Sequence, residues 1–139
     1  MSANPLAMWH QLIQDRNPKG LAAILSDQVI FHSPIVHTPQ AGKSITVKYL
    51  TAALSVFVND SFRYVRKVTS HHDAVLEFQV EIDGIAVNGV DMITWNQEGQ
   101  IIDFKVMLRP LQAINLIHKK MELMLQAKQT AKDELSHSD

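Results

Sequence analysis

Residues 25–43 read LSDQVIFHSPIVHTPQAGK, and this stretch decides the fold. Its VIFHS segment predicts a short strand that ends at Ser33, with side chains alternating between two faces. Pro34 and Pro39 mark the loop that follows, and a helix begins after Gly42. We therefore expect a buried strand that leads through a proline-marked loop into a helix.

The rest of the chain alternates between helical and strand patterns. Asn-Pro pairs at positions 4–5 and 17–18 each give a helix start. From Phe62 the pattern changes to period two, which predicts four antiparallel strands, with an Asp-Gly hairpin signal at 83–84. A last helix follows Pro110. Helices on one side of an antiparallel meander predict the α+β class.

One domain accounts for this order. We expect residues 1–128 to fold together, with a C-terminal helix at 110–128 that covers the sheet or supports a dimer. Residues 129–139 are polar and are expected to form a frayed tail. The chain contains no internal repeat and no linker.

Composition excludes several classes of function. The 139 residues include 13 basic and 14 acidic side chains, so no overall positive field attracts nucleic acid or an anionic membrane. The chain has no cysteine, which rules out disulfides, thiol nucleophiles and thiolate metal sites. It also lacks a signal-peptide pattern and an apolar run of the ~20 residues that a spanning helix needs. We expect a cytoplasmic protein that uses no cofactor and no metal.

Asp91 carries the strongest functional argument. It shares a strand face with Val87 and Ile93, so its carboxyl is expected among apolar side chains. Burial disfavours the charged form of a carboxylate, and Asp91 could then act as a general acid or donate to a ligand oxygen. The alternative is a structural carboxylate at a pocket rim, or one satisfied by backbone N–H groups or by the indole of Trp9.

The histidines give one further catalytic candidate. His37 lies in the loop beyond Pro34, where it could overhang a pocket, and imidazole exchanges protons near neutral pH. His32 falls in the opposite strand phase from Ser33 and is expected on the outer layer or against a dimer partner. Residues 71–72 form a His-His pair that we interpret as structural, since adjacent strand residues point to opposite faces.

Three segments, LSDQVIFHSP, AGKSITVKYL and GVDMITWNQEGQIIDF, resemble the NTF2-like superfamily, and within it the SnoaL-like and ketosteroid isomerase-like proteins. This resemblance implies a cystatin-like cone, in which a curved, mainly antiparallel sheet packs on three helices around a pocket. The C-terminal helix is an addition to that plan. Many members form homodimers through the open sheet face, so the resemblance also implies a homodimer and a small apolar ligand. The side chains expected to line the pocket are Trp9, Phe31, Ser33, Leu54, Phe57, Leu76, Phe78, Val87 and Phe104.

The register with the ketosteroid isomerases locates three functional positions. Their catalytic base, an Asp directly before a Pro, falls on Ser33, and their oxyanion-hole Tyr falls on Trp9. Their second oxyanion-hole group, an Asp kept neutral by an apolar site, falls on Asp91. A serine without a base partner cannot remove a proton next to a carbonyl near neutral pH. The sequence therefore predicts that this chain is not a ketosteroid isomerase.

Two classes of function fit these observations. The first is a cofactor-free isomerase, cyclase or dehydratase for an apolar, oxygen-bearing molecule, with Asp91 as acid or hydrogen-bond donor and His37 as base. The second is a non-catalytic module for small-molecule binding or dimerisation, because two of the three isomerase residues are replaced.

Overall fold

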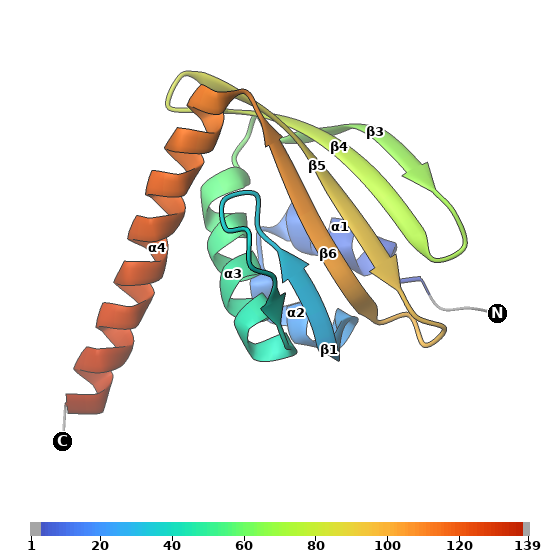
Figure 1. Ribbon diagram of the computed structural model, residues 1–139, viewed down its shortest axis with the longest axis horizontal. Helices are drawn as coiled ribbons and strands as arrows, with labels where there is room; N and C mark the ends of the chain where they lie inside the picture. The colour runs from blue at the N-terminus through green and yellow to red at the C-terminus, as the bar shows by residue number, and fades with distance from the viewer. Residues whose placement is uncertain (1–3, 138–139) are drawn as a thin grey trace.

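The structure, a computed structural model, describes the backbone of residues 4–137 and the side chains of residues 4–127. A curved six-stranded sheet packs on one face against the N-terminal helices, and a last helix runs along its side (Figure 1). The elements in chain order are α1 (Leu6–Asp15), η1 (Pro18–Gly20), α2 (Leu21–Ile24), β1 (Leu25–His32), β2 (Gln40–Ala41), α3 (Lys43–Phe57), β3 (Arg63–Thr69), β4 (Asp73–Ile82), β5 (Ile85–Trp95), β6 (Ile101–Arg109) and α4 (Leu111–His137).

The sheet is mixed, with the strand order β2-β1-β6-β5-β4-β3. Strands β3 to β6 form the predicted antiparallel meander, and β1 joins its β6 edge in parallel. The two-residue strand β2 pairs with β1 and was not predicted, because so short a strand leaves no periodic pattern. The predicted α+β cone is confirmed.

Both Asn-Pro helix starts are confirmed by side-chain hydrogen bonds. The Asn4 side-chain oxygen accepts from the Leu6 N–H at 2.8 Å, and the Asn17 oxygen accepts from the Lys19 N–H at 3.0 Å. These bonds satisfy N–H groups that a first helical turn cannot pair internally. They fix where α1 and η1 begin, and so how the N-terminal helices meet the sheet.

The core forms two neighbouring clusters. The larger one lies under α1 and α2, where Leu21, Leu25 and Ile101 are fully buried. The second joins α3, β4, β5 and the start of α4 through Phe57, Phe78 and other apolar side chains. A small cavity lies where the two clusters meet, lined by residues of both.

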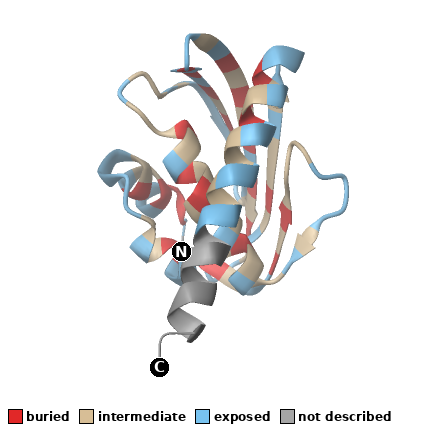
Figure 2. Ribbon diagram, turned by 90° about the vertical axis from the view of Figure 1, so that its left-hand side faces the viewer, coloured by how far each residue is buried: buried red, intermediate tan, exposed pale blue. Residues whose placement is uncertain are grey.

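Helix α4 packs against α3 and the adjoining sheet through its first two turns. Ala113 and Ile117 are fully buried, whereas no described side chain from residue 118 to residue 127 is buried (Figure 2). The backbone continues as helix to His137, beyond the boundary at residue 128 that the sequence predicts. Within the described residues, no helix combines the length and apolar character needed to cross a membrane.

Candidate functional site

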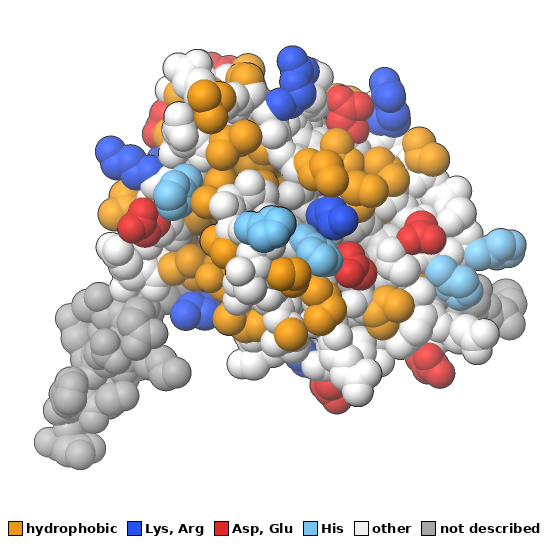
Figure 3. Space-filling model, in the orientation of Figure 1, with side chains coloured by type: hydrophobic (Ala, Val, Ile, Leu, Met, Phe, Trp, Pro, Cys, Tyr) orange, Lys and Arg blue, Asp and Glu red, His pale blue; other side chains and the backbone are white. Residues whose placement is uncertain are grey.

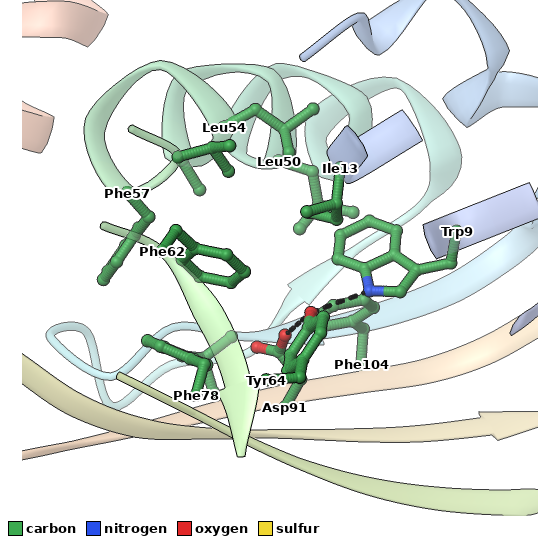
Figure 4. Close-up of a pocket in the computed structure, with 13 residues that line it drawn as sticks. Trp9, Ile13, Leu50, Leu54, Phe57, Phe62, Tyr64, Phe78, Asp91 and Phe104 are labelled. Atoms are coloured by element: carbon green, nitrogen blue, oxygen red, sulfur yellow. Dashed lines mark hydrogen bonds between the residues drawn. The ribbon is translucent and has the colours of Figure 1, made fainter. Parts of the chain in front are cut away.

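A small cavity of about 40 Å³ lies between α1, α3 and the inner face of the sheet (Figure 4). Most of its wall is apolar, and among the described residues the polar side chains that line it are those of Trp9, Tyr64 and Asp91. We call it the inner cavity; its lining comprises Trp9, Ile13, Leu50, Ala53, Leu54, Phe57, Val58, Phe62, Tyr64, Phe78, Asp91, Phe104 and Val106.

The three polar side chains form one chain of hydrogen bonds. The Trp9 indole Nε1–H donates to the Tyr64 hydroxyl oxygen at 2.9 Å, and the Tyr64 O–H donates to Oδ2 of Asp91 at 2.6 Å (Figure 4). An indole N–H can only donate, so the tyrosine oxygen must accept from it and keeps its own proton for the carboxyl. The other carboxyl oxygen of Asp91, Oδ1, has no hydrogen-bond partner among the described residues and is available to a ligand.

The three hydrogen-bonded side chains come from elements that are distant in sequence. Trp9 comes from α1, Tyr64 from β3 and Asp91 from β5. Strand β4 sets the register between the two strands, because Tyr64 pairs with Phe78 and Asp91 pairs with Leu76. All of these positions face the same side of the sheet, since Phe78 and Leu76 are two residues apart on β4.

Burial changes the acid–base behaviour of Asp91. Only 6% of the residue is exposed, and burial raises the pKa of its carboxyl from the usual 3.8 to about 7, although the hydrogen bond from Tyr64 lowers it in part. Near neutral pH the carboxyl therefore exists in both its protonated and its ionised form. A group poised in this way can remove a proton and return it.

Tyr64 stays protonated over the whole neutral range. Burial, and then the negative charge of Asp91, raise the pKa of its phenol well above the usual value. Its hydroxyl is therefore a permanent donor beside a carboxyl that can titrate. The indole of Trp9 packs edge-on against Phe104, with ring centroids 5.0 Å apart, which holds its N–H toward Tyr64.

Gly89 makes room for the aromatic wall of the inner cavity. It pairs with Phe78 across the β4–β5 ladder, and a Cβ atom at this position would lie 2.3 Å from the Phe78 ring. The ring therefore occupies the space above the glycine and stacks on Phe62, with centroids 5.3 Å apart. Phe78 also meets Phe57 of α3 edge-on, with centroids 5.6 Å apart, so the three rings form a continuous aromatic part of the cavity wall.

The structure places most of the sequence-predicted pocket residues around the inner cavity, namely Asp91, Trp9, Leu54, Phe57, Phe78 and Phe104. Leu76 and Val87 are instead enclosed in the larger and the smaller core cluster, respectively. They share the inward strand phase, but other side chains cover them from that side. Strand phase predicts the face of a sheet and not the depth at which a side chain is covered.

Ser33 and Phe31 lie apart from Asp91, along a second and larger groove between the end of β1, α3 and α4. The Ser33 hydroxyl oxygen accepts hydrogen bonds from the N–H groups of Ile35 and Val36, at 3.1 and 3.4 Å. Serine commonly makes such bonds to backbone two or three residues on, and they shape the turn after a strand. The position that carries the base in ketosteroid isomerases thus serves a turn here.

His37 also lies away from the inner cavity. It is exposed, in a surface depression that it shares with His32 and Lys105. His32 points away from the cavity and places its Nε2 3.0 Å from Oδ2 of Asp103. The structure therefore does not bring His37 together with Asp91.

Sequence reasoning missed Tyr64, which joins the other two polar groups. The available signal was an aromatic hydroxyl in the period-two pattern that starts at Phe62. A register shift between Tyr64 and Arg66 interrupts the ladder with β4, so the strand phase is hard to read from the pattern alone. Within the described residues, no group of three or more His, Asp or Glu side chains is placed to hold a metal ion.

Solved structures of related proteins share this architecture. The structure superposes with a TM-score of 0.86 on a steroid delta-isomerase from Pseudomonas aeruginosa, which is 35% identical over 90% of this chain and 91% of that one. An uncharacterised protein with a cystatin-like fold from Silicibacter pomeroyi is 27% identical, with a TM-score of 0.75 over 88% of this chain and 83% of that one.

More distant similarities support the fold alone. SalBIII, an epoxide hydrolase/cyclase-like enzyme of pyran ring formation in salinomycin, is 12% identical, with a TM-score of 0.61 over 75% of this chain and 87% of that one. No protein-family model matches the sequence, and no curated protein matches it either. The resemblance to NTF2-like proteins that the sequence indicated is confirmed by the solved structures.

Proposed function

The chain belongs to the steroid delta-isomerase-like family of the NTF2-like superfamily, and on that basis we propose that it isomerises a small apolar carbonyl compound without a cofactor. The observation that carries the proposal is Asp91, a buried carboxyl whose pKa is raised to about 7 and which accepts a hydrogen bond from Tyr64 in an otherwise apolar cavity. The carbonyl oxygen of the ligand takes the place of the carboxyl as the acceptor of the Tyr64 proton.

The proposed reaction moves one proton. Ionised Asp91 removes a proton from the carbon next to the carbonyl, and the C–H electron pair shifts to give an enolate. The Tyr64 O–H donates to the enolate oxygen, where negative charge develops. Protonated Asp91 then returns the proton to a different carbon, which shifts the double bond and restores the ionised carboxyl. A pKa near the working pH suits a group that must both accept and release a proton.

This assignment differs from the sequence-based hypothesis, which paired Asp91 as acid with His37 as base. His37 does not line the inner cavity, whereas the Tyr64 hydroxyl lies 2.6 Å from the carboxyl. Tyr64 supplies the donor and Asp91 becomes the proton carrier. Ser33, at the position of the isomerase base, takes no part.

The test measures double-bond migration in a panel of β,γ-unsaturated ketones. A Δ5-3-ketosteroid belongs in the panel, because 35% identity to a steroid delta-isomerase keeps that reaction among those to be tested despite Ser33. We expect Asp91→Asn to lower turnover by 10²–10⁴-fold, the usual contribution of a positioned acid or base. Asp27→Asn, which changes a carboxyl that is 91% exposed on the surface, is the matched control and should leave turnover unchanged. Turnover that survives in Asp91→Asn would rule out this mechanism.

A second function, binding without catalysis, is favoured by one observation. Among the residues that the structure describes, Asp91 is the one carboxyl that lines the inner cavity, so an acid–base reaction there depends on it and on Tyr64. In a binding protein, ketones would bind to the wild type and more weakly to Asp91→Asn, as measured by NMR titration, and no member of the panel would react. The two functions thus differ in turnover and agree on the binding site.

We also propose that two copies pair through the outer face of the sheet. Val68, Met92, Ile102 and Met107 keep at least 37% exposure there, and hydrophobic side chains gather across this face (Figure 3). Two of them, Met92 and Val68, flank Val75 in the ladders β3–β4–β5, which makes the apolar patch continuous. We expect Met107→Glu to convert a dimer to a monomer in light scattering, whereas Leu123→Glu on α4 leaves the mass unchanged.

A further inference from the structure

A hollow lies on the outer face of the sheet, on the side away from the inner cavity and toward the β4–β5 hairpin. Its volume is about 520 Å³, which is within the ~300–1,000 Å³ usual for small-molecule sites. Charged side chains stand at the upper edge of this face, beyond its hydrophobic side chains (Figure 3). We call this space the outer hollow; its polar side chains are those of Ser61, Arg63, Gln79, Glu81, Asn88 and Arg109.

Strand register places four of these side chains in one row. Arg63 pairs with Gln79 across the β3–β4 ladder. Gln79 pairs with Asn88, which in turn pairs with Arg109 on β6. The row faces outward, because Phe78 lines the inner cavity and adjacent strand residues point to opposite faces. The row is therefore polar along its whole length, with an arginine at each end.

The two arginines of the row differ from the other two in the chain. Arg16 and Arg66 each pair with a carboxylate. Within the described residues, neither Arg63 nor Arg109 forms an ion pair, and both side chains are exposed. The guanidinium fork matches the two oxygens of a carboxylate. The two arginines without a carboxylate partner thus line the same hollow, where an anion can reach both.

The two amides between the arginines have hydrogen-bonding groups to spare. Arg63 donates to the Gln79 side-chain oxygen at 2.9 Å, which leaves the Gln79 NH₂ group to donate. The Asn88 NH₂ group donates to Glu77 and to the backbone oxygen of Phe78, each at 3.0 Å, which leaves the Asn88 oxygen to accept. The row therefore offers a ligand both donors and an acceptor.

Glu81 limits the charge that the outer hollow can hold. It lines the hollow from β4, on the same face as Gln79 two residues away. Two arginines and one glutamate leave one net positive charge, which a single carboxylate neutralises. A second carboxylate would be repelled by Glu81, whereas a hydroxyl or ammonium group could donate to it.

We propose that the outer hollow binds a small α-hydroxy or α-amino acid. The carboxylate of the acid lies between the two arginines and the Gln79 amide, and its hydroxyl or ammonium group donates to Asn88 and Glu81. The inference does not rest on the proposed function, since the hollow and the inner cavity lie on opposite faces of the sheet. The row borders the apolar side chains proposed to pair two copies, because Met107 is two residues from Arg109 on β6.

The test compares L-alanine, L-lactate and propionate, which differ only in the group next to the carboxylate: ammonium, hydroxyl or hydrogen. Binding is measured by NMR titration of ¹⁵N-labelled protein at low ionic strength, where charge attraction is least screened. The first two acids should bind about tenfold more tightly than propionate, because they make further hydrogen bonds. Equal affinity for all three, or tighter binding of inorganic sulfate, would reduce the hollow to a general anion trap and overturn the inference.

The same titration locates the site in the unmutated protein. The side-chain NH₂ signals of Gln79 and Asn88 should shift as L-lactate is added. The indole N–H of Trp9, in the inner cavity, should not shift. A shift at Trp9 with none at the two amides would place the acid in the inner cavity and contradict the inference.

Exposed side chains allow variants that leave the core intact. Arg63→Gln and Arg109→Gln should each weaken L-lactate binding about tenfold or more, because hydrogen bonds to charged groups are the stronger kind. Lys67→Gln is the control: it removes the same charge from β3, on the opposite face with its partner Leu76, and should change affinity no more than about twofold. Unchanged affinity in both arginine variants would overturn the inference.

Glu81→Gln identifies which of the two acids the outer hollow prefers to hold. It removes the negative charge beside an ammonium group, so L-alanine should bind about tenfold more weakly. L-Lactate should bind as tightly as before or more tightly, since its hydroxyl is neutral and its carboxylate loses a repulsive neighbour. An equal loss for both acids would contradict the assignment of Glu81 to the ammonium group.

Discussion

The inner cavity and the loop after β1 both carry polar side chains that could take part in a reaction. The hydrogen-bonding groups of these side chains find their partners in opposite ways in the two regions. In the cavity, Trp9, Tyr64 and Asp91 bond to one another across 55 and 27 residues of sequence. In the loop, the Ser33 hydroxyl bonds to backbone two and three residues away. Hydrogen bonds between side chains distant in sequence hold a titratable carboxyl in the core. Hydrogen bonds from a side chain to nearby backbone stabilise a turn instead.

The difference shows which polar residue of a cone-shaped domain is open to chemistry. A hydroxyl whose oxygen already accepts from two backbone N–H groups is fixed in position and helps to hold the turn in place. A carboxyl that receives one hydrogen bond in an apolar wall has its pKa raised and keeps a second oxygen available.

Asp91→Asn should have the largest effect, and the effect should depend on pH. Above pH ~4 the carboxyl ionises in the unfolded chain, while the folded protein keeps its proton until about pH 7, so the stability of the wild type falls as the pH rises through this range. At ~1.4 kcal/mol for each pH unit between the two pKa values, the loss reaches about 4 kcal/mol.

Asparagine does not ionise and should not show this loss. Urea unfolding at pH 4.5 and at pH 8 should therefore find the variant gaining stability relative to the wild type as the pH rises. The gain between these two pH values should be about 3 kcal/mol, because the unfolded carboxyl is already mostly ionised at pH 4.5. All other titratable groups are the same in the two proteins, so their contributions cancel when the free energies of unfolding are subtracted. A stability difference that is the same at both pH values would show that the Asp91 pKa is not raised.

Tyr64→Phe should be the next largest change. It removes the acceptor of the Trp9 N–H and the donor to Asp91, and leaving buried polar groups unpaired costs ~1–3 kcal/mol. The pKa of Asp91 should rise further above about 7, because the hydrogen bond from Tyr64 is what lowers it. Carboxyl carbon NMR against pH measures this pKa directly. Tyr49→Phe is the control and should leave the titration of Asp91 unchanged.

The sequence predicted the fold more completely than the site. Period-two alternation and Asn-Pro starts are local signals, and they predicted the meander and the first helices that the structure contains. Asp91 was found because its strand phase is regular over the whole of β5. Tyr64 was missed because its place beside Asp91 depends on two strand pairings and a register shift, none of which is encoded locally.

The same limit explains why some of the predicted pocket residues do not line the inner cavity. Phase predicted that Leu76 and Ser33 face inward, but helix packing decides which inward positions remain beside a cavity. Leu76 is covered by the larger core cluster, whereas Ser33 lies at the end of β1, along the groove between β1, α3 and α4. Depth and cover depend on contacts between elements, which a single-sequence pattern does not contain.

Ser33→Ala tests the loop side of the comparison and should cost less than the cavity variants. It removes one acceptor of two N–H groups near the surface, where water can replace the hydroxyl, so we expect a loss of ~0.5–1.5 kcal/mol in urea unfolding. The titration of Asp91 should be unchanged, because Ser33 does not line the inner cavity. A shift in the Asp91 pKa would show that Ser33 and Asp91 are coupled, and would contradict the independence of the two regions.

His37→Ala should have the smallest effect. The side chain is exposed and lies in a surface depression, so its removal should change the free energy of unfolding by no more than ~0.5 kcal/mol. Turnover of any ketone that the wild type isomerises should also stay the same, along with its pH profile. A loss of turnover at unchanged stability would show that the loop folds over the inner cavity when a ligand is bound. In that case the imidazole would be the base that the sequence-based hypothesis assigned, and Asp91 would return to the role of acid.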